Sequence, residues 1–238
     1  MTAGAPDGQA GMRRAVQEEG GLTLSGQRPT IRLVADLVCP WCCIAFARVQ
    51  RLLATRPAEL VWHPFLLNPH LPTAGVARAY YLERKFGSVS QAKSAYRRIA
   101  EAGASEGIRF SFAAIGIQPN TVLAHGLVLR ASACGRLAPT VSALFKAFFE
   151  EGADIGDPEV LGGIARRLDL PVDAGALAGD QDLPGRVAQA HEEAYALGIN
   201  GVPVCLFGDD HVIAGAQPLE ALTALLDLQR YRDGGAGL

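Results

Sequence analysis

Three of the five cysteines in the chain fall in one short segment, Cys39-Pro40-Trp41-Cys42-Cys43. A Cys-x-x-Cys pair can cycle between dithiol and disulfide, or it can supply two of the four ligands of a zinc site. Zinc would require two more ligands at suitable spacing, but Cys134 and Cys205 stand alone in the sequence and none of the five histidines pairs with them. We therefore favour redox chemistry and expect no metal, with a pair of buried structural cysteines as the simpler alternative.

The residues around this motif indicate which elements position the two thiols. Residues 30–38 form a β-branched and aliphatic run that predicts a buried strand, and this run ends at the motif. From Pro40 onward apolar residues recur at helical spacing until Pro57, and residues 59–67 have strand character again. The succession of strand, helix and strand supports two parallel strands joined by a right-handed crossover.

This setting gives the two cysteines different roles. A thiol at the N-terminus of a helix lies beside unpaired N–H groups and the positive end of the helix dipole, and both favour an anion. Because the thiolate is the nucleophile, we expect Cys39 to attack a disulfide and Cys42, one turn inside the helix, to resolve the mixed disulfide. Pro40 suits the first helical turn, where a backbone N–H would have no partner.

The remaining sequence predicts a helical module inserted into an α/β unit. A turn-rich connector precedes the module, and two short strands over 202–207 and 211–214 follow it, before a last helix over 217–230. The expected helices of the module span 76–86, 90–106, 121–134, 139–150, 158–168 and 183–197. We assign the domains as follows: a disordered tail at 1–28, an α/β domain at 29–72 and 198–232, and an inserted helical domain at 73–197.

The composition excludes several classes of protein. With 49% hydrophobic and 19% charged residues and a formal net charge of −2, the chain has the balance of a globular protein and not of a nucleic-acid binder. No apolar run approaches the roughly 20 residues needed to span a bilayer, and the tail lacks the apolar core of a secretory signal. We expect a cytoplasmic protein with neither a membrane nor a nucleic-acid partner.

Several segments together resemble one family of redox proteins. They are Asp36-Leu37-Val38-Cys39-Pro40-Trp41-Cys42, Trp62-His63-Pro64-Phe65-Leu66-Leu67-Asn68-Pro69, Tyr81-Leu82-Glu83-Arg84-Lys85-Phe86-Gly87, Asn120-Thr121-Val122-Leu123-Ala124-His125, Ala147-Phe148-Phe149-Glu150-Glu151-Gly152, and Gly201-Val202-Pro203 with Gly215-Ala216-Gln217. They look like the DsbA-like family of thioredoxin-fold oxidoreductases, and in particular its FrnE-like branch. The resemblance covers about residues 30–226 and implies a thioredoxin-like fold with a large α-helical insertion domain.

The resemblance also implies how substrate would be held. Family members place a cis proline beside the dithiol, so Val202 and a cis Pro203 would offer backbone to an extended substrate strand. Pro40, Trp41 and Asn68 are the further candidate substrate contacts. The protein would exchange disulfides with protein or small-thiol substrates as a monomer or homodimer, with glutathione as a candidate co-substrate and no tightly bound cofactor.

Two other functions stay open from the sequence. A related branch, the kappa-class glutathione transferases and 2-hydroxychromene-2-carboxylate isomerases, binds glutathione on the same scaffold. That branch typically has Ser at the position of Cys39 and lacks the second Cys, so the presence of both thiols argues against it. A redox-inert protein that holds an apolar metabolite between the domains would instead keep its function after Cys39→Ser.

Three residues near the dithiol allow more than one interpretation. Asp36 could accept a proton or raise the thiol pKa by repulsion, or it could only cap the end of the strand. Cys43, where this branch would have an aromatic residue, could be a third thiol or a small hydrophobe. Cys205 lies two residues beyond Pro203 on the same strand face, and it could approach the dithiol or be an ordinary buried cysteine.

Four other positions carry weaker signals. His125 matches a family position, although a helix histidine with satisfied hydrogen bonds is the simpler interpretation. Asn68 could bind a ligand or start the following proline turn. Trp41 is expected to be exposed, with an apolar surface for substrate, and Trp62 to lie in the core.

Overall fold

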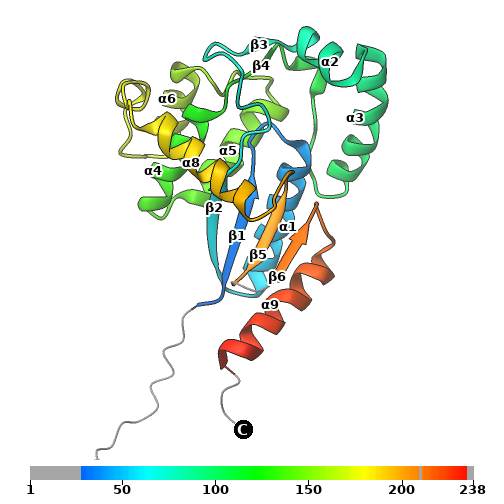
Figure 1. Ribbon diagram of the computed structural model, residues 1–238, viewed down its shortest axis with the longest axis vertical. Helices are drawn as coiled ribbons and strands as arrows, with labels where there is room; N and C mark the ends of the chain where they lie inside the picture. The colour runs from blue at the N-terminus through cyan, green and yellow to red at the C-terminus, as the bar shows by residue number, and fades with distance from the viewer. Residues whose placement is uncertain (1–27, 209–210, 235–238) are drawn as a thin grey trace, which may run out of the picture.

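A four-stranded sheet forms the centre of the computed structural model, which describes residues 28–208 and 211–234; the expected tail lies outside these residues except for its last position. The strands are β1 (Thr30–Ala35), β2 (Glu59–Pro64), β5 (Val204–Phe207) and β6 (His211–Ala214). Their order is β2-β1-β5-β6, with β1 and β2 parallel and the other pairs antiparallel (Figure 1). Helix α1 (Pro40–Thr55) joins the parallel pair, as the strand-helix-strand pattern predicts.

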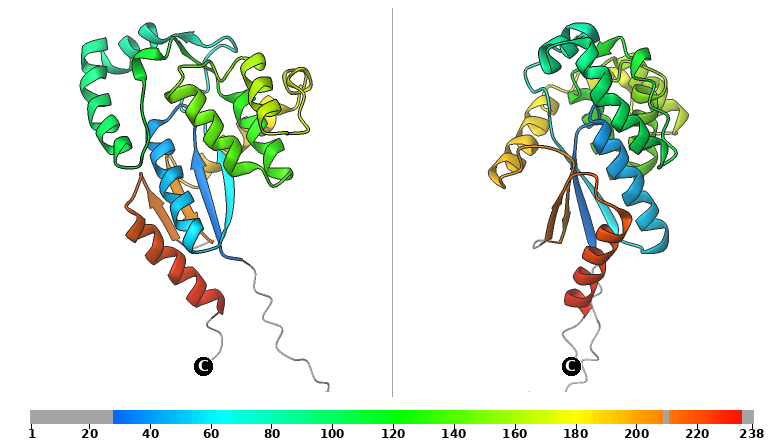
Figure 2. Two further views of the ribbon diagram at one scale, coloured as in Figure 1. Left: turned by 180° about the vertical axis from the view of Figure 1, so that it is seen from behind. Right: turned by 90° about the vertical axis from the view of Figure 1, so that its right-hand side faces the viewer.

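The segment between β2 and β5 is mainly helical. Its helices are α2 (Arg78–Phe86), α3 (Val89–Ala104), α4 (Val122–Ala133), α5 (Leu137–Phe149), α6 (Pro158–Arg167), α7 (Ala174–Ala178) and α8 (Leu183–Ala196). They gather beyond the end of the sheet at which β1 leads into α1 (Figure 1). The last helix, α9 (Leu219–Gly234), returns to the sheet and packs beside α1, while α8 lies against the opposite face (Figure 2). The predicted α/β fold class with a large helical insertion is confirmed.

Two apolar clusters hold these layers together. On the face covered by α1, Leu33 and Cys205 join a large core that continues into the helical segment. Phe46 of α1 meets Phe145 of α5 there, with ring centroids 5.9 Å apart. On the other face, Val34 packs in a smaller cluster with Ala194 of α8. Helix α1 therefore packs through one continuous core against both the sheet and the helical segment.

Ion pairs reinforce the same junction. The Arg48 guanidinium of α1 contacts the Glu106 carboxylate at 2.7 Å and donates to the carbonyl oxygen of Ala216 at 2.7 Å. Arg51, one turn further along α1, pairs with the other Glu106 oxygen at 2.9 Å. One helix thus connects the end of α3 with the segment that precedes α9. The domain boundaries proposed above stay a prediction.

Element boundaries differ from the predictions where distant residues decide them. Val76–Ala77, expected as helix, is the strand β3, which pairs antiparallel with β4 (Ile117–Gln118). That prediction was wrong because the pairing partner lies beyond α3, where local periodicity carries no information. The short helices η1 (Phe112–Ala114) and α7 were not predicted. Pairing of β5 begins at Val204 and not at residue 202, since Pro203 has no N–H to donate.

Candidate active site

Cys39 is the N-cap residue of α1, and its backbone conformation is extended, with φ −92° and ψ 114°. The Cys39 carbonyl accepts hydrogen bonds from the N–H groups of Cys42 at 3.0 Å and Cys43 at 3.2 Å. The Cys39 side chain therefore lies where the first backbone N–H groups of the helix are free of intrahelical partners. Its Sγ is 3.7 Å from the carbonyl oxygen of Val202, and the Val202–Pro203 peptide bond is cis.

The two thiols of the motif have opposite electrostatic surroundings. The pKa of Cys39 is lowered, first because the Cys42 thiol donates a hydrogen bond to it and then because backbone N–H groups at the helix start do the same. Burial and the nearby Asp36 carboxylate oppose this shift. The pKa of Cys42 is raised well above its ordinary value by burial and by its role as donor to Cys39. Cys39 is thus suited to exist as a thiolate and Cys42 to remain a thiol.

Asp36 lies behind the dithiol and connects three elements. Its carboxylate accepts hydrogen bonds from the N–H groups of Val38 at 3.4 Å and Leu67 at 2.8 Å, so it holds the turn after β1 and the chain after β2. It also acts electrostatically on both thiols. The two interpretations of Asp36, capping residue and thiol modulator, are therefore compatible.

His125 of α4 reaches the same carboxylate from the helical segment. Trp62 donates its indole N–H to His125 Nδ1 at 3.1 Å, which assigns the proton of a neutral ring to Nε2. Nε2 lies 3.6 Å from Asp36 Oδ1, and both side chains are fully buried. Nε2 has no hydrogen-bond partner among the described residues, so the histidine is not a fully satisfied helix residue as the simpler interpretation required. Trp62 lies in the core, as predicted.

A second histidine near Asp36 was not identified as a candidate from the sequence. His191 of α8 accepts the N–H of Leu66 through Nδ1 at 3.2 Å and lies edge-on to Phe65, with ring centroids 4.6 Å apart. Burial lowers the pKa of His191, and Asp36 opposes that shift. The sequence predicts a helix around His191, but it does not indicate that this side chain faces the residues that follow β1 and β2.

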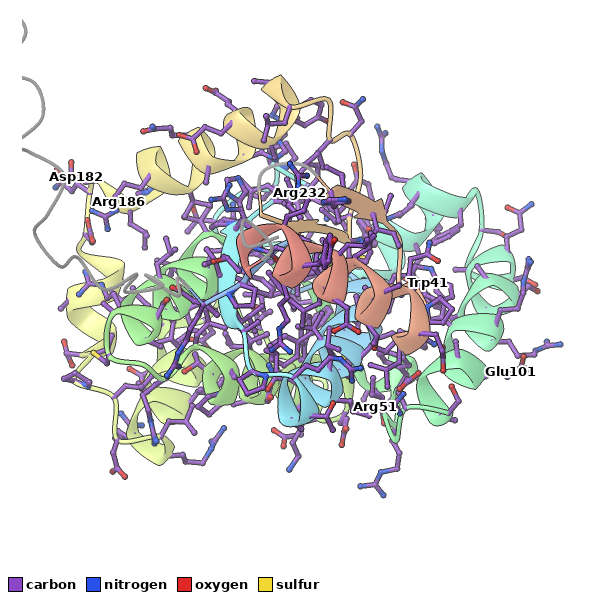
Figure 3. All side chains as sticks on the ribbon, turned by 90° about the horizontal axis from the view of Figure 1, so that it is seen from below. Trp41, Arg51, Glu101, Asp182, Arg186 and Arg232 are labelled. Carbon is purple, nitrogen blue, oxygen red and sulfur yellow. The ribbon has the colours of Figure 1, made fainter. Side chains whose placement is uncertain are left out.

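The predicted substrate contacts are brought together only in part. Pro40 lies in the first turn of α1, beside Cys39. Trp41 is 40% exposed, as predicted, and is labelled in the view from below (Figure 3). The Asn68 carbonyl accepts the N–H of Leu71 at 3.2 Å, so this residue does start a turn. Its Nδ2 is buried without a partner among the described residues, and its role toward a ligand stays a prediction.

The other buried cysteines differ from the dithiol. Burial raises the pKa of both Cys43 and Cys205 to about 12, which keeps them as unreactive thiols at neutral pH. Cys43 lines a cavity of about 290 Å³ beside Phe46 and Phe145. Both environments favour the interpretation as small buried hydrophobes. Within residues 28–208 and 211–234, no cluster of three or more His, Cys, Asp or Glu side chains is arranged to hold a metal ion.

A mixed sheet, a Cys-x-x-Cys pair at the start of the following helix and a cis Val202–Pro203 bond whose carbonyl faces the first sulfur are the features of a thioredoxin-like fold. The DSBA-like thioredoxin domain model matches residues 30–227. The chain belongs to this family, whose members are thiol–disulfide oxidoreductases or related enzymes.

Three solved structures illustrate the similarity. The probable DsbA oxidoreductase of Streptomyces coelicolor is 25% identical, with a TM-score of 0.75 over 88% of this chain and 92% of that one. A 2-hydroxychromene-2-carboxylate isomerase is 14% identical, with a TM-score of 0.65 over 88% of this chain and 100% of that one. The cytosolic disulfide reductase DsbM of Pseudomonas aeruginosa, solved with GSH, is 16% identical, with a TM-score of 0.57 over 88% and 100%. The last two show the shared fold alone.

No helix in the described part of the chain is both long and apolar enough to cross a bilayer. The exposed residues labelled in Figure 3 include charged side chains on several helices, among them Arg51 on α1 and Glu101 on α3.

Proposed function

We propose that this protein is a dithiol–disulfide oxidoreductase that works through a mixed disulfide at Cys39. The observation that carries the proposal is the opposite displacement of the two thiol pKa values within one hydrogen-bonded pair. A nucleophile with a lowered pKa has a larger thiolate fraction at a given pH than an ordinary thiol, and it is also a better leaving group. A partner with a raised pKa waits as a thiol until the mixed disulfide has formed.

The proposed reaction has two exchanges. The Cys39 thiolate attacks one sulfur of a substrate disulfide, the substrate S–S bond breaks, and the released substrate thiolate takes up a proton. The Cys42 sulfur, after losing its proton, then attacks Cys39 Sγ and releases the second substrate thiolate. The substrate disulfide gains two electrons and becomes a dithiol, while Cys39 and Cys42 become a disulfide; the reverse sequence oxidises a substrate dithiol.

The proton of Cys42 requires an acceptor because the pKa of this thiol is raised. Asp36 is the candidate, since its carboxylate interacts electrostatically with both thiols and lies in the same buried site. Asp36 would thus act as a general base in the second exchange.

Substrate recognition would rest mainly on backbone. The carbonyl of Val202 is held beside Cys39 by the cis peptide bond to Pro203. An extended substrate segment could pair with this backbone by β-type hydrogen bonds, which recognise the main chain and leave side chains largely unread. Exposed Trp41, two residues after Cys39, would add an apolar contact to the substrate.

We further propose a cytoplasmic location and glutathione as a co-substrate. Support comes from the structural neighbour DsbM, which is a cytosolic disulfide reductase solved with GSH. Small thiol or protein disulfides are the proposed partners, and the choice between monomer and homodimer stays a prediction. No tightly bound cofactor is needed, because the electrons come from the dithiol itself.

The proposal is tested by measuring insulin-disulfide reduction and exchange with oxidised glutathione for the wild type and for Cys39→Ser. Loss of both activities in the variant is expected, because serine cannot form the mixed disulfide. Cys134→Ser is the matched control, since Cys134 is exposed and should leave both activities unchanged. A wild-type protein that exchanges with neither probe would refute the proposal.

The isomerase-like neighbour supplies the alternative outcome. Its structure shares this fold with a TM-score of 0.65. A glutathione-dependent isomerase would retain its activity in Cys39→Ser, because that branch typically has Ser at this position. Retained turnover of a 2-hydroxychromene-2-carboxylate by the variant would therefore favour the alternative over disulfide exchange.

A further inference from the structure

A cavity of about 620 Å³ lies in the helical segment, and its lining does not include the residues that form the dithiol site. Its walls come from α2, from α3 and from the chain around η1, which run beside one another in Figure 1. The volume is in the range of pockets that bind small organic molecules. The cavity is therefore large enough to hold such a molecule.

The charged residues of this cavity are all cationic. Arg78, Lys93 and Arg97 contribute to the wall, and no Asp or Glu is among the described lining residues. Arg78 is only 6% exposed and forms no ion pair with any described carboxylate. A buried cation without an anionic partner is costly, and an anion in the cavity would offset that cost.

Hydrogen-bond donors also outnumber acceptors around Arg78. The guanidinium donates to Gln118 Oε1 and, at 2.7 Å, to the Tyr96 hydroxyl. Arg78 Nε and Gln118 Nε2 are both buried and have no acceptor among the described residues. Gln118 lies outside the cavity wall, whereas Arg78 belongs to it, so the unpaired Nε of Arg78 is the donor that a ligand acceptor in the cavity could satisfy.

Tyr96 can add a third donor. Burial raises its pKa to about 12, so the phenol stays protonated at neutral pH. Its oxygen accepts from Arg78, and its own hydrogen can therefore be donated to a ligand beside the guanidinium. An Arg and a Tyr hydroxyl presented side by side suit a planar carboxylate.

The remaining wall is apolar and largely aromatic. Tyr96 stacks on Phe112 with ring centroids 4.2 Å apart, and Phe112 stacks on Phe110 at 4.9 Å. The ring planes in both pairs are nearly parallel, at 14° and 12°, so the three rings form one stack. The stack offers an apolar surface to a ligand and adds little discrimination among apolar groups.

We propose that this cavity binds an organic anion whose carboxylate pairs with Arg78 and Tyr96 and whose apolar body lies against Phe110 and Phe112. The carboxylate can belong to a small aromatic acid or to the C-terminus of a peptide that ends in an aromatic residue. Binding does not depend on thiol chemistry and goes beyond the proposed exchange activity.

The test is equilibrium binding to the full chain of 2-naphthoate and of its neutral match, naphthalene-2-carboxamide. Wild type should prefer the acid by about 10- to 100-fold, the range expected for charge-assisted hydrogen bonds. Arg78→Gln should abolish that preference, and Tyr96→Phe should reduce it. Arg84→Gln is the matched control, because Arg84 is an exposed residue of the same helix outside the cavity wall.

A second arm distinguishes the two sources of the carboxylate. The tripeptide Ala-Ala-Phe is compared as free acid and as C-terminal amide. An Arg78-dependent preference for its free acid would identify the ligand as a peptide C-terminus. A preference confined to naphthoate would identify the ligand as a small acid. Equal binding of acid and amide in both pairs, or no binding of any probe, would overturn the proposal. If Arg78→Gln does not fold, two measurements still test the proposal: the preference of wild type for the acid, and the reduction of that preference in Tyr96→Phe. Cys39→Ser should bind like wild type, so failure of the redox proposal leaves this result interpretable.

Discussion

Cys39 and Cys205 show how two cysteines in one apolar core can differ in chemistry. Both are almost completely buried, at 5% and 1% exposure. Burial alone raises the pKa of Cys205 to about 12, whereas the pKa of Cys39 is lowered despite burial. Cys205 lies within β5, opposite Leu33 of β1 and Ile213 of β6. Cys39 lies at the start of a helix, where a thiol and backbone N–H groups can donate to it.

The difference shows that a thiol in this fold becomes reactive through its position relative to a helix N-terminus and a second thiol. Desolvation acts on both sites and disfavours both thiolates. Only at Cys39 do hydrogen bonds to the charged form outweigh it. Variants that remove the groups around Cys39 test whether those groups make this thiol reactive. A variant at Cys205 tests whether that residue matters only for packing.

Cys42→Ser should have the largest effect. The variant loses the thiol that resolves the mixed disulfide, so the protein should react once with oxidised glutathione and then stall as a Cys39 adduct. Intact-protein mass spectrometry would detect one glutathione per chain, and peptide mapping would locate it. An adduct at Cys43 or Cys205 instead would contradict the assignment of the nucleophile.

Cys205→Ser should affect stability and leave exchange unchanged. A hydroxyl buried at this position has no evident partner, which should lower the free energy of unfolding by about 1–3 kcal/mol. Urea unfolding measures this change, and the insulin assay on the folded variant measures activity. A loss of exchange activity in folded Cys205→Ser would show that the contrast between the two cysteines is mistaken.

Asp36→Asn should have a moderate effect on the ionisation of Cys39. The Asp36 charge raises the pKa of Cys39, so its removal should lower that pKa further and increase the thiolate fraction at neutral pH. Alkylation of Cys39 by iodoacetamide should become faster at pH 7, with its half-maximal pH displaced downward. The Asn side-chain oxygen can still accept the N–H of Leu67, which limits structural change. Slower resolution by Cys42 in the same variant is expected if Asp36 is the base, and unchanged resolution would remove it from that role.

Trp41→Ala should have the smallest effect. A substitution at this exposed position should change stability by no more than about 0.5 kcal/mol. Reduction of insulin should slow modestly, because a polypeptide substrate loses an apolar contact, while exchange with glutathione stays close to wild type. Equal slowing of both substrates would show that Trp41 acts on the dithiol and not on recognition.

Sequence alone predicted the dithiol, its strand-to-helix setting and the helical insertion. These predictions succeeded because they rest on local features: adjacent cysteines, a run of apolar residues and the placement of Pro40. The contact between Asp36 and His125 could not be predicted, because it depends on how α4 packs against the end of β2. Strand β3 was missed for the same reason, since its partner β4 is remote in the sequence.

Gly126 of α4 lies at a close contact that depends on tertiary packing and that the sequence does not reveal. A Cβ at this position would lie 2.4 Å from a methyl carbon of Leu183, so a larger residue would require that side chain to shift. The cavity that Arg78 lines could not be predicted from the sequence either, because α2, α3 and the η1 segment form it from separate parts of the chain.

The most direct test of the central claim is the pH dependence of alkylation measured separately for each cysteine of the reduced wild type by peptide mass spectrometry. Cys39 should react with a half-maximal pH well below that of an ordinary thiol, which is about 8.5. Cys42, Cys43 and Cys205 should remain unmodified over the same range, because the pKa of each is raised by burial. A half-maximal pH for Cys39 at or above that of an ordinary thiol would contradict the account.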